Sequence, residues 1–100
     1  MSIRSKLRVV PSGYSPGGFI VYMARNKNER PDPGEPQTRT ARTGDFNFSF
    51  SYFPGAGPEL LEIEPQTDNY RKARLESTPQ MRVQNNRMEV IDANFAIQRR

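Results

Sequence analysis

The chain has 100 residues, a formal net charge of +4 and 34% hydrophobic residues, which is room for one domain. It contains neither Cys nor His, which excludes disulfide scaffolds, thiolate catalysis and the commonest general base and zinc ligand. No apolar run approaches the roughly 18 residues that span a bilayer, and the N-terminal segment lacks the apolar region of a secretory signal. We therefore expect one cytoplasmic domain, or a subunit assembled into a particle from the cytoplasm, with no cofactor and no bound metal.

The supply of apolar side chains is small, and the charges are unevenly distributed. Leu, Ile, Val and Phe make up 20 of the 100 residues, so the chain is expected to be marginally stable as a monomer and to act as a component. Residues 1–44 carry a net charge of +5, residues 45–68 of −5 and residues 69–100 of +4. Such segregation suits an oriented contact with a partner or with copies of itself. The alternative is a solvated surface without a partner.

Residues 3–10 predict the first strand, because apolar and basic side chains alternate there. One face is apolar, the other carries a basic stripe, and Pro11 ends the strand because it has no N–H to donate. The motif SPGG at residues 15–18 predicts a type II turn with Gly17 in the left-handed conformation. Residues 18–25 are apolar on both faces and predict a central strand. The basic stripe consists of Arg4, Lys6 and Arg8.

Residues 25–44 predict a long loop. They contain three prolines and eight charged residues, and no Leu, Ile, Val or aromatic residue, so they have little to bury. We expect a single small β domain over residues 1–100 with a mobile loop at about 26–44, and the strands on either side of the loop are expected to pair as a hairpin. The basic residues of this segment are candidate partner contacts: Arg25, Lys27, Arg30, Arg39 and Arg42.

Residues 45–53, DFNFSFSYF, predict a strand with its rings on one face. The F-x-F-x-F spacing resembles the ring-bearing strand of RNA-recognition and cold-shock domains, in which aromatic side chains stack on bases. Here the intervening residues are Asn47, Ser49 and Ser51, which make a poor core, so the rings are expected to be the buried side, with a stacking platform as the alternative. Phe53, on the opposite face at the strand end, is a candidate contact, with packing beside Pro54 as an equal alternative. The four rings are Phe46, Phe48, Phe50 and Tyr52.

The remaining elements are short. A turn at residues 53–58 precedes a strand at 59–64. Residues 67–77 fit either a short helix or a strand, and we favour the helix because Thr or Asp can cap it. Residues 81–84 and 88–97 predict a hairpin across Asn85-Asn86, with a bulge at 92–94. The sum is an all-β or mainly β fold of five to seven strands, an antiparallel barrel or sandwich with at most one short helix.

Other motifs give no catalytic signature. Glu59, Glu62 and Glu64 form a carboxylate cluster without a calcium-loop pattern, so they predict a solvated acidic face or one that docks on a basic surface of another copy. The glycine-rich stretches are not followed by the Lys and Ser or Thr of a phosphate loop. The serines lack a His that would activate them. We therefore expect that the chain is not an enzyme.

The basic clusters are the candidate binding residues. Twelve of the fifteen basic residues are Arg, whose planar guanidinium suits bidentate contacts to phosphate or carboxylate. Protection of strand edges against aggregation is an equal alternative. Besides the basic stripe, the candidates are the cluster Arg71, Lys72 and Arg74, and the tail Arg99-Arg100.

Two functions fit these features. The first is a non-catalytic interaction or assembly subunit, for example of a bacteriophage virion, or a phage-encoded inhibitor. It would dock on a protein partner, or on copies of itself, through the long loop and the basic N-terminal strand. The second is a small nucleic-acid-binding β-barrel of the oligonucleotide-binding type, with Tyr14, Tyr22 and Phe53 as exposed rings. Neither involves a membrane or a small-molecule substrate.

Overall fold

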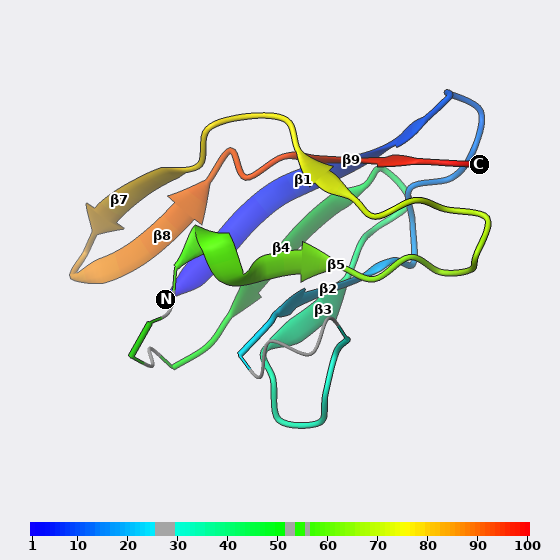
Figure 1. The fold of residues 1–100 in the computed structure, drawn as a ribbon. Helices are drawn as coiled ribbons and strands as arrows, with labels where there is room; N and C mark the ends of the chain where they lie inside the picture. Colours follow the sequence, from blue (N-terminus) through cyan, green and yellow to red (C-terminus); the bar gives the residue numbers. More distant parts are fainter. Residues whose placement is uncertain (26–29, 52–53, 56) are drawn as a thin grey trace.

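The computed structural model describes residues 1–25, 30–51, 54–55 and 57–100. Within these ranges the chain is mainly β, with two sheets and no α-helix (Figure 1), which confirms the all-β class. The described residues contain nine strands, more than the five to seven predicted, and the sheets do not close into a barrel. No helix in the described part of the chain is long and apolar enough to cross a membrane.

The larger sheet has the strand order β6-β9-β1-β8-β7, with β4 also paired to β1. The smaller sheet has the order β3-β2-β5, and a single 3-10 turn, η1, precedes β5. The strands of the larger sheet are β1 (Ser2–Val10), β4 (Asp45–Ser49), β6 (Arg74–Leu75), β7 (Gln80–Gln84), β8 (Arg87–Ile91) and β9 (Phe95–Gln98). The smaller sheet contains β2 (Ile20–Met23), β3 (Gln37–Arg39) and β5 (Leu61–Ile63), and η1 covers Pro58–Leu60.

The first strand has the alternation that the sequence predicts. Ile3, Leu7 and Val9 are buried, whereas the basic residues between them are exposed. Strand β1 pairs with β4 in antiparallel orientation, and with β8 and β9 in parallel orientation. It is therefore the strand that connects most of the larger sheet. The two parallel pairs make this sheet mixed, which corrects the prediction of an antiparallel fold.

The predicted bulge at residues 92–94 is confirmed. Arg4 lies opposite Ile91, and Leu7 lies opposite Phe95. The chain between β8 and β9 therefore contains one residue more than the part of β1 that it follows. Two hydrogen bonds hold the bulge on β1: the Ala93 N–H donates to the Ser5 hydroxyl over 2.8 Å, and the Lys6 N–H donates to the Asn94 side-chain oxygen over 3.1 Å. The single strand expected at 88–97 is therefore two strands that follow one another along β1.

The hairpin across Asn85-Asn86 is also confirmed. Gln84 pairs with Arg87, and both turn residues have positive φ, at 51° and 62°. This is the geometry of a type I′ turn, which Asn tolerates better than most residues.

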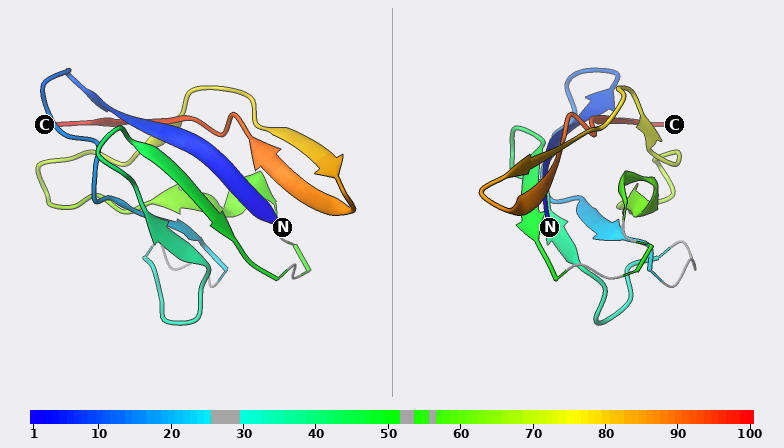
Figure 2. Two further views of the ribbon diagram at one scale, coloured as in Figure 1. Left: turned by 180° about the vertical axis from the view of Figure 1, so that it is seen from behind. Right: turned by 90° about the vertical axis from the view of Figure 1, so that its left-hand side faces the viewer.

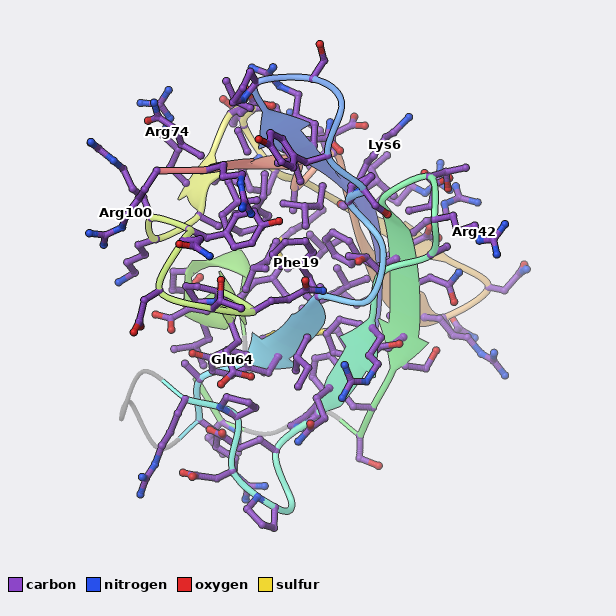
Figure 3. The ribbon with its side chains drawn as sticks, turned by 90° about the vertical axis from the view of Figure 1, so that its right-hand side faces the viewer. Lys6, Phe19, Arg42, Glu64, Arg74 and Arg100 are labelled. Carbon is purple, nitrogen blue, oxygen red and sulfur yellow. The ribbon has the colours of Figure 1, made fainter. Side chains whose placement is uncertain are left out.

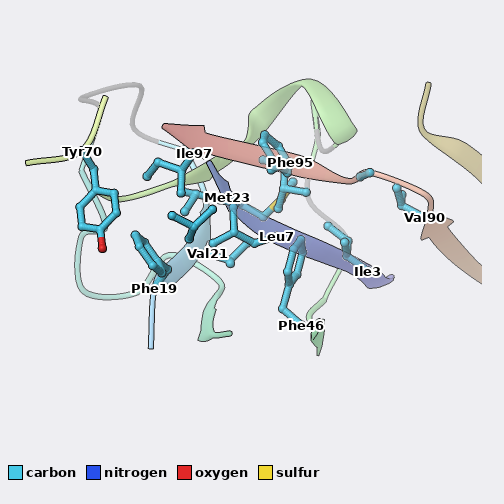
Figure 4. Close-up of a cluster of buried hydrophobic side chains, with 14 residues drawn as sticks. Ile3, Leu7, Phe19, Val21, Met23, Phe46, Tyr70, Val90, Phe95 and Ile97 are labelled. Carbon is cyan, nitrogen blue, oxygen red and sulfur yellow. The ribbon is translucent and has the colours of Figure 1, made fainter. Parts of the chain in front are cut away.

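The two sheets share one core (Figure 4). Val21, Met23, Leu61 and Ile63 of the smaller sheet pack with buried residues of the larger one. At one end of the core, the Phe19 and Tyr70 rings meet edge to face, with centroids 5.2 Å apart, a geometry that aromatic pairs favour. The buried residues of the larger sheet and its flanking segments include Ile3, Leu7, Val9, Phe46, Val90, Phe95 and Ile97.

The aromatic strand contributes to this core, as expected from its intervening polar residues. Phe46 is only 2% exposed. Phe48 and Phe50 are partly buried against the core, and their rings stack with centroids 5.7 Å apart. The fourth ring, Tyr52, lies outside the described residues. The burial of the described rings therefore decreases along the strand, from the buried Phe46 to the partly buried Phe48 and Phe50. We call this arrangement the graded core.

The structure corrects the prediction for residues 25–44. Strand β3 lies within this segment and pairs with β2, and both Glu35 and Thr40 are buried. The strands on either side of the segment do not form a hairpin with each other, because β2 pairs with β3 and β5 while β4 pairs with β1. In the described part, residues 30–44, main-chain hydrogen bonds and polar side chains, which hydrophobic periodicity does not report, connect the segment to the rest of the fold.

Two other local predictions are wrong. Residues 67–77 form no helix: Tyr70 makes a bridge with Arg99, and β6 pairs with β9, so the segment follows the edge of the larger sheet. In the SPGG turn the left-handed residue is Gly18, with φ of +80°, rather than Gly17. For residues 67–77, pairing with the distant strand β9 outweighs the local preference.

We predict that Phe46→Ala lowers the free energy of unfolding by about 3–5 kcal/mol, the usual cost of emptying a buried aromatic site. Phe48→Ala should cost less, because this ring is only partly buried. Denaturant unfolding of both variants tests the order. An equal or larger loss at Phe48 would contradict the graded core.

We predict that Thr40→Val destabilises the fold although valine has nearly the same shape. The buried Thr40 hydroxyl accepts a hydrogen bond from the Phe19 N–H over 3.0 Å and donates to the Pro16 carbonyl. Leaving such a buried donor unsatisfied costs about 1–3 kcal/mol. Thr40→Ser, which keeps the hydroxyl, is the matched control, and equal unfolding midpoints for the two variants would show that the hydroxyl is not needed.

Candidate interaction surfaces

The basic stripe on β1 is exposed, but acidic side chains of the same sheet neutralise much of it. The Arg8 guanidinium forms a bidentate pair with Glu76, with its Nε 2.8 Å from each carboxylate oxygen. Arg4 lies 3.6 Å from Glu89. Lys6 makes no ion pair with any described residue. Two of the three predicted contact residues are therefore already engaged within the sheet.

The contact between Arg8 and Glu76 shifts both titrations. The hydrogen bond from Arg8, together with its charge and that of Arg74, holds the pKa of the Glu76 carboxyl below its usual value. The hydrogen bond to Glu76, and then its charge, raise the pKa of Arg8. Both side chains lie at the surface, where salt screens such pairs. This contact fastens the segment after β6 to β1 and does not present a charge to a ligand.

The second basic cluster converges on a depression at the edge of the larger sheet. Arg71, Lys72 and Arg74 line it together with parts of β9, and its volume is about 250 Å³. The Arg71 N–H donates to the Gln98 carbonyl over 2.8 Å, and Arg74 pairs with Ala96. Pairing with β9 therefore gathers the three neighbouring cations around one hollow. The remaining lining residues are Val10, Ala96 and Gln98.

The basic tail joins this cluster. Tyr70 and Arg99 form a bridge, and the Arg100 N–H donates to the Asn69 carbonyl over 2.6 Å. The Arg99 guanidinium lies 4.5 Å from the centroid of the Tyr14 ring and 5.4 Å from that of Tyr70, within cation–π range. Together these contacts bring both C-terminal arginines beside the residues that begin the second cluster.

The exposed rings expected from the sequence are only partly found. Tyr14 is 45% exposed, as predicted, whereas Tyr22 is buried and only 1% exposed. The Tyr22 hydroxyl donates to Glu62 over 2.9 Å, and burial followed by this contact raises the pKa of Tyr22. Phe53 lies outside the described residues. Tyr14 is therefore the exposed ring that the structure supports among the three.

The basic residues that the structure describes in the long segment do not line the depression of the second cluster. Arg39 donates to the Gly18 carbonyl over 3.0 Å, and Arg30 lies 3.5 Å from Asp32. Arg42 is exposed on the same side of the molecule as Lys6, whereas Arg74 and Arg100 lie on the opposite side (Figure 3). Arg25, two residues after the end of β2, is exposed. Lys27 lies outside the described residues.

The acidic cluster shows no arrangement for a metal. Glu59 is exposed, and Glu62 and Glu64 are partly buried on and beside β5. Within the described ranges there is no group of three or more carboxylate, His or Cys side chains that could hold a metal ion. Glu62 instead accepts the hydrogen bond from Tyr22, which is a structural role.

The sequence did not single out the apolar face of the β7–β8 hairpin. Val83 lies opposite Met88, and Met81 lies opposite Val90, so these four side chains share one face. Val90, at the base, is buried, but Met81 is 50%, Met88 36% and Val83 71% exposed. The alternation of Met and Val on both strands predicts such a face, yet only the tertiary structure shows that it lacks a cover.

The hairpin projects from one end of the molecule, beyond the smaller sheet (Figure 2). Strand β7 is the last strand in the order of the larger sheet, so its outer edge has no neighbouring strand among the described residues. Comparison with known proteins finds no matching family model, no similar curated protein and no similar solved structure. The assignment of function therefore depends on these surfaces.

We predict that Arg8→Gln returns the pKa of Glu76 toward the ordinary Glu value of about 4.3. Because the folded-state pKa is depressed, the stability from this pair is present above that ordinary value and is lost as the pH falls through the lower pKa of the folded protein. Carboxyl titration by NMR measures the shift. Arg42→Gln is the control, and an unchanged Glu76 pKa in Arg8→Gln would disprove the pairing.

Proposed function

We propose that the chain is a non-catalytic interaction and assembly subunit that docks on a protein partner through the β7–β8 hairpin. The observation that carries this proposal is the row of exposed apolar side chains at Met81, Val83 and Met88 on one face. Contiguous exposed apolar surface on a soluble protein typically marks a contact site. Met is common at such surfaces because its flexible side chain adapts to a partner.

The outer edge of β7 supports the same proposal. Its main-chain N–H and C=O groups have no strand partner in the described part of the chain. An extended segment of a partner can add to such an edge, so that main-chain hydrogen bonds provide affinity and side-chain contacts provide specificity. The apolar face and the open edge belong to the same strand, so one partner can use both.

The opposite face of the hairpin is polar and internally compensated. Arg82 lies 3.4 Å from Glu89, which also pairs with Arg4. A partner therefore gains more from the apolar face than from this charged one. For the same reason we place the main contact on the hairpin, and not on the basic stripe of β1 or on the long loop that the sequence suggested.

The rest of the fold fits a supporting role. In this proposal the two sheets form an open, sandwich-like base that holds the hairpin away from the core. A small apolar core is typical of chains that gain stability from association. A partner that covers the hairpin would remove from water the apolar surface that the fold leaves exposed.

We predict that Val83→Asp weakens partner binding strongly, because it places a charge in the centre of the apolar face. Central contact residues typically contribute about 2 kcal/mol or more, which corresponds to roughly thirtyfold in Kd. The partner is the protein that the wild-type chain retains from extracts of its source cells, a second copy included, and Kd is then measured with the purified pair.

Gln80→Asp is the matched control, since it adds the same charge to the same strand on the polar face. Circular dichroism shows that both variants fold. Equal losses of affinity in the two variants would contradict docking through the apolar face, as would a wild-type chain that retains no protein.

A further inference from the structure

The end of the molecule away from the hairpin is basic. The molecule is elongated, with extents of 41 × 25 × 20 Å, and the hairpin and the C-terminus lie at opposite ends (Figures 1 and 2). Five cationic side chains gather near the C-terminal end through the pairing of residues 69–75 with β9 and the tail. They are Arg71, Lys72, Arg74, Arg99 and Arg100.

The arginines that line the depression at this end lack, within the described residues, the ion pairs that Arg4 and Arg8 of the basic stripe make. No acidic side chain lines the depression around Arg71 and Arg74. Within the described ranges, neither of these arginines nor Arg100 forms an ion pair with a carboxylate side chain. Glu76, which directly follows β6, is engaged by Arg8. Arginine side chains that gather without an ion-paired carboxylate favour an anionic ligand.

An aromatic platform adjoins the cations. Tyr14 is 45% exposed, and the Arg99 guanidinium lies 4.5 Å from its ring centroid. Arg99 also contacts Tyr70, whose ring packs on Phe19 in the core. The Arg99 N–H donates to the carbonyl of Val10, which itself lines the depression. The platform and the depression are therefore joined through ordered contacts with the core and with β1.

We propose that this basic end binds single-stranded nucleic acid. Backbone phosphates bind in the depression between Arg71 and Arg74, where guanidinium groups can make bidentate contacts. An unpaired base stacks on the exposed Tyr14 ring. Single-strand-binding proteins combine two features: cations that follow the phosphate backbone, and aromatic side chains on which bases stack. A single strand is favoured over a duplex because stacking requires a base without a pairing partner. The site is separate from the docking hairpin.

Fluorescence anisotropy with a labelled 12-residue oligothymidylate tests the proposal, at 50 and 200 mM salt. The variant Arg71→Gln/Arg74→Gln should lose about tenfold or more in affinity. Its logarithmic salt slope should be shallower by about 1.4, since each phosphate contact to a single strand contributes about 0.7. The matched control is Arg42→Gln/Arg87→Gln, which removes the same charge elsewhere and should lose no more than about threefold by the general electrostatic effect.

Tyr14→Leu tests the stacking contact separately. Leucine keeps an apolar side chain beside Arg99 but removes the aromatic face, so affinity should fall about fivefold or more while the salt slope stays the same. Circular dichroism confirms folding of each variant. Val83→Asp, which changes the hairpin, should bind the oligonucleotide as the wild type does, so this test is independent of the docking proposal.

Any one of the following results would overturn the inference. These are the absence of wild-type binding at 50 mM salt, equal losses in the two double variants, an unchanged affinity of Tyr14→Leu, and equal affinity for polyglutamate of the same charge. Equally tight binding of thymidine monophosphate and the oligonucleotide would also overturn it, because the site would then bind a small phosphorylated ligand and not a strand.

Discussion

The pairing of β1 with strands from the rest of the chain is the constraint on which the structure depends. Over its first half, β1 pairs with β4 and β8, and over its second half it pairs with β9. Alternate residues of β1, such as Ile3 and Leu7, lie in the core. A slip of one residue would therefore exchange buried apolar side chains for the basic stripe. The bulge on Ser5 and Lys6 lets β8 and β9 both follow β1 although one residue is inserted between them.

The start of β1 also explains why one hairpin is left uncovered. Strand β1 begins at Ser2 and pairs with β8 only at Glu89, Val90 and Ile91, so the rest of the hairpin lies beyond its first residue. Along the hairpin, exposure rises from the buried Val90 at the base to Val83 near the turn. The same apolar alternation thus begins in the core and continues into solvent. This gradient is the physical basis for the docking surface that we propose, because a partner covering the tip would extend an apolar layer that begins in the core.

The arginines of the larger sheet fall into two groups, those that pair with a carboxylate and those that do not. Arg8 with Glu76, and Arg4 and Arg82 with Glu89, form contacts within the larger sheet. At the C-terminal end, pairing of the edge segment with β9 brings Arg71 and Arg74 around one depression without a carboxylate. Arginines without an ion-paired carboxylate among the described residues therefore lie together at the end away from the apolar hairpin. The elongated shape keeps the two proposed surfaces apart, so both can be occupied together.

The sequence by itself determined the features that depend on neighbouring residues. These are the alternation on β1, the turn at Asn85-Asn86, the bulge after β8 and the burial of Phe46, because strand periodicity and turn conformation are local properties. Only the tertiary structure decided that residues 37–39 pair with β2, that residues 67–77 follow β9 instead of forming a helix, and which cations carboxylates neutralise. It also decided which apolar face stays uncovered. Each of these outcomes depends on contacts between segments far apart along the chain, and such contacts outweigh the small free-energy differences of local preference.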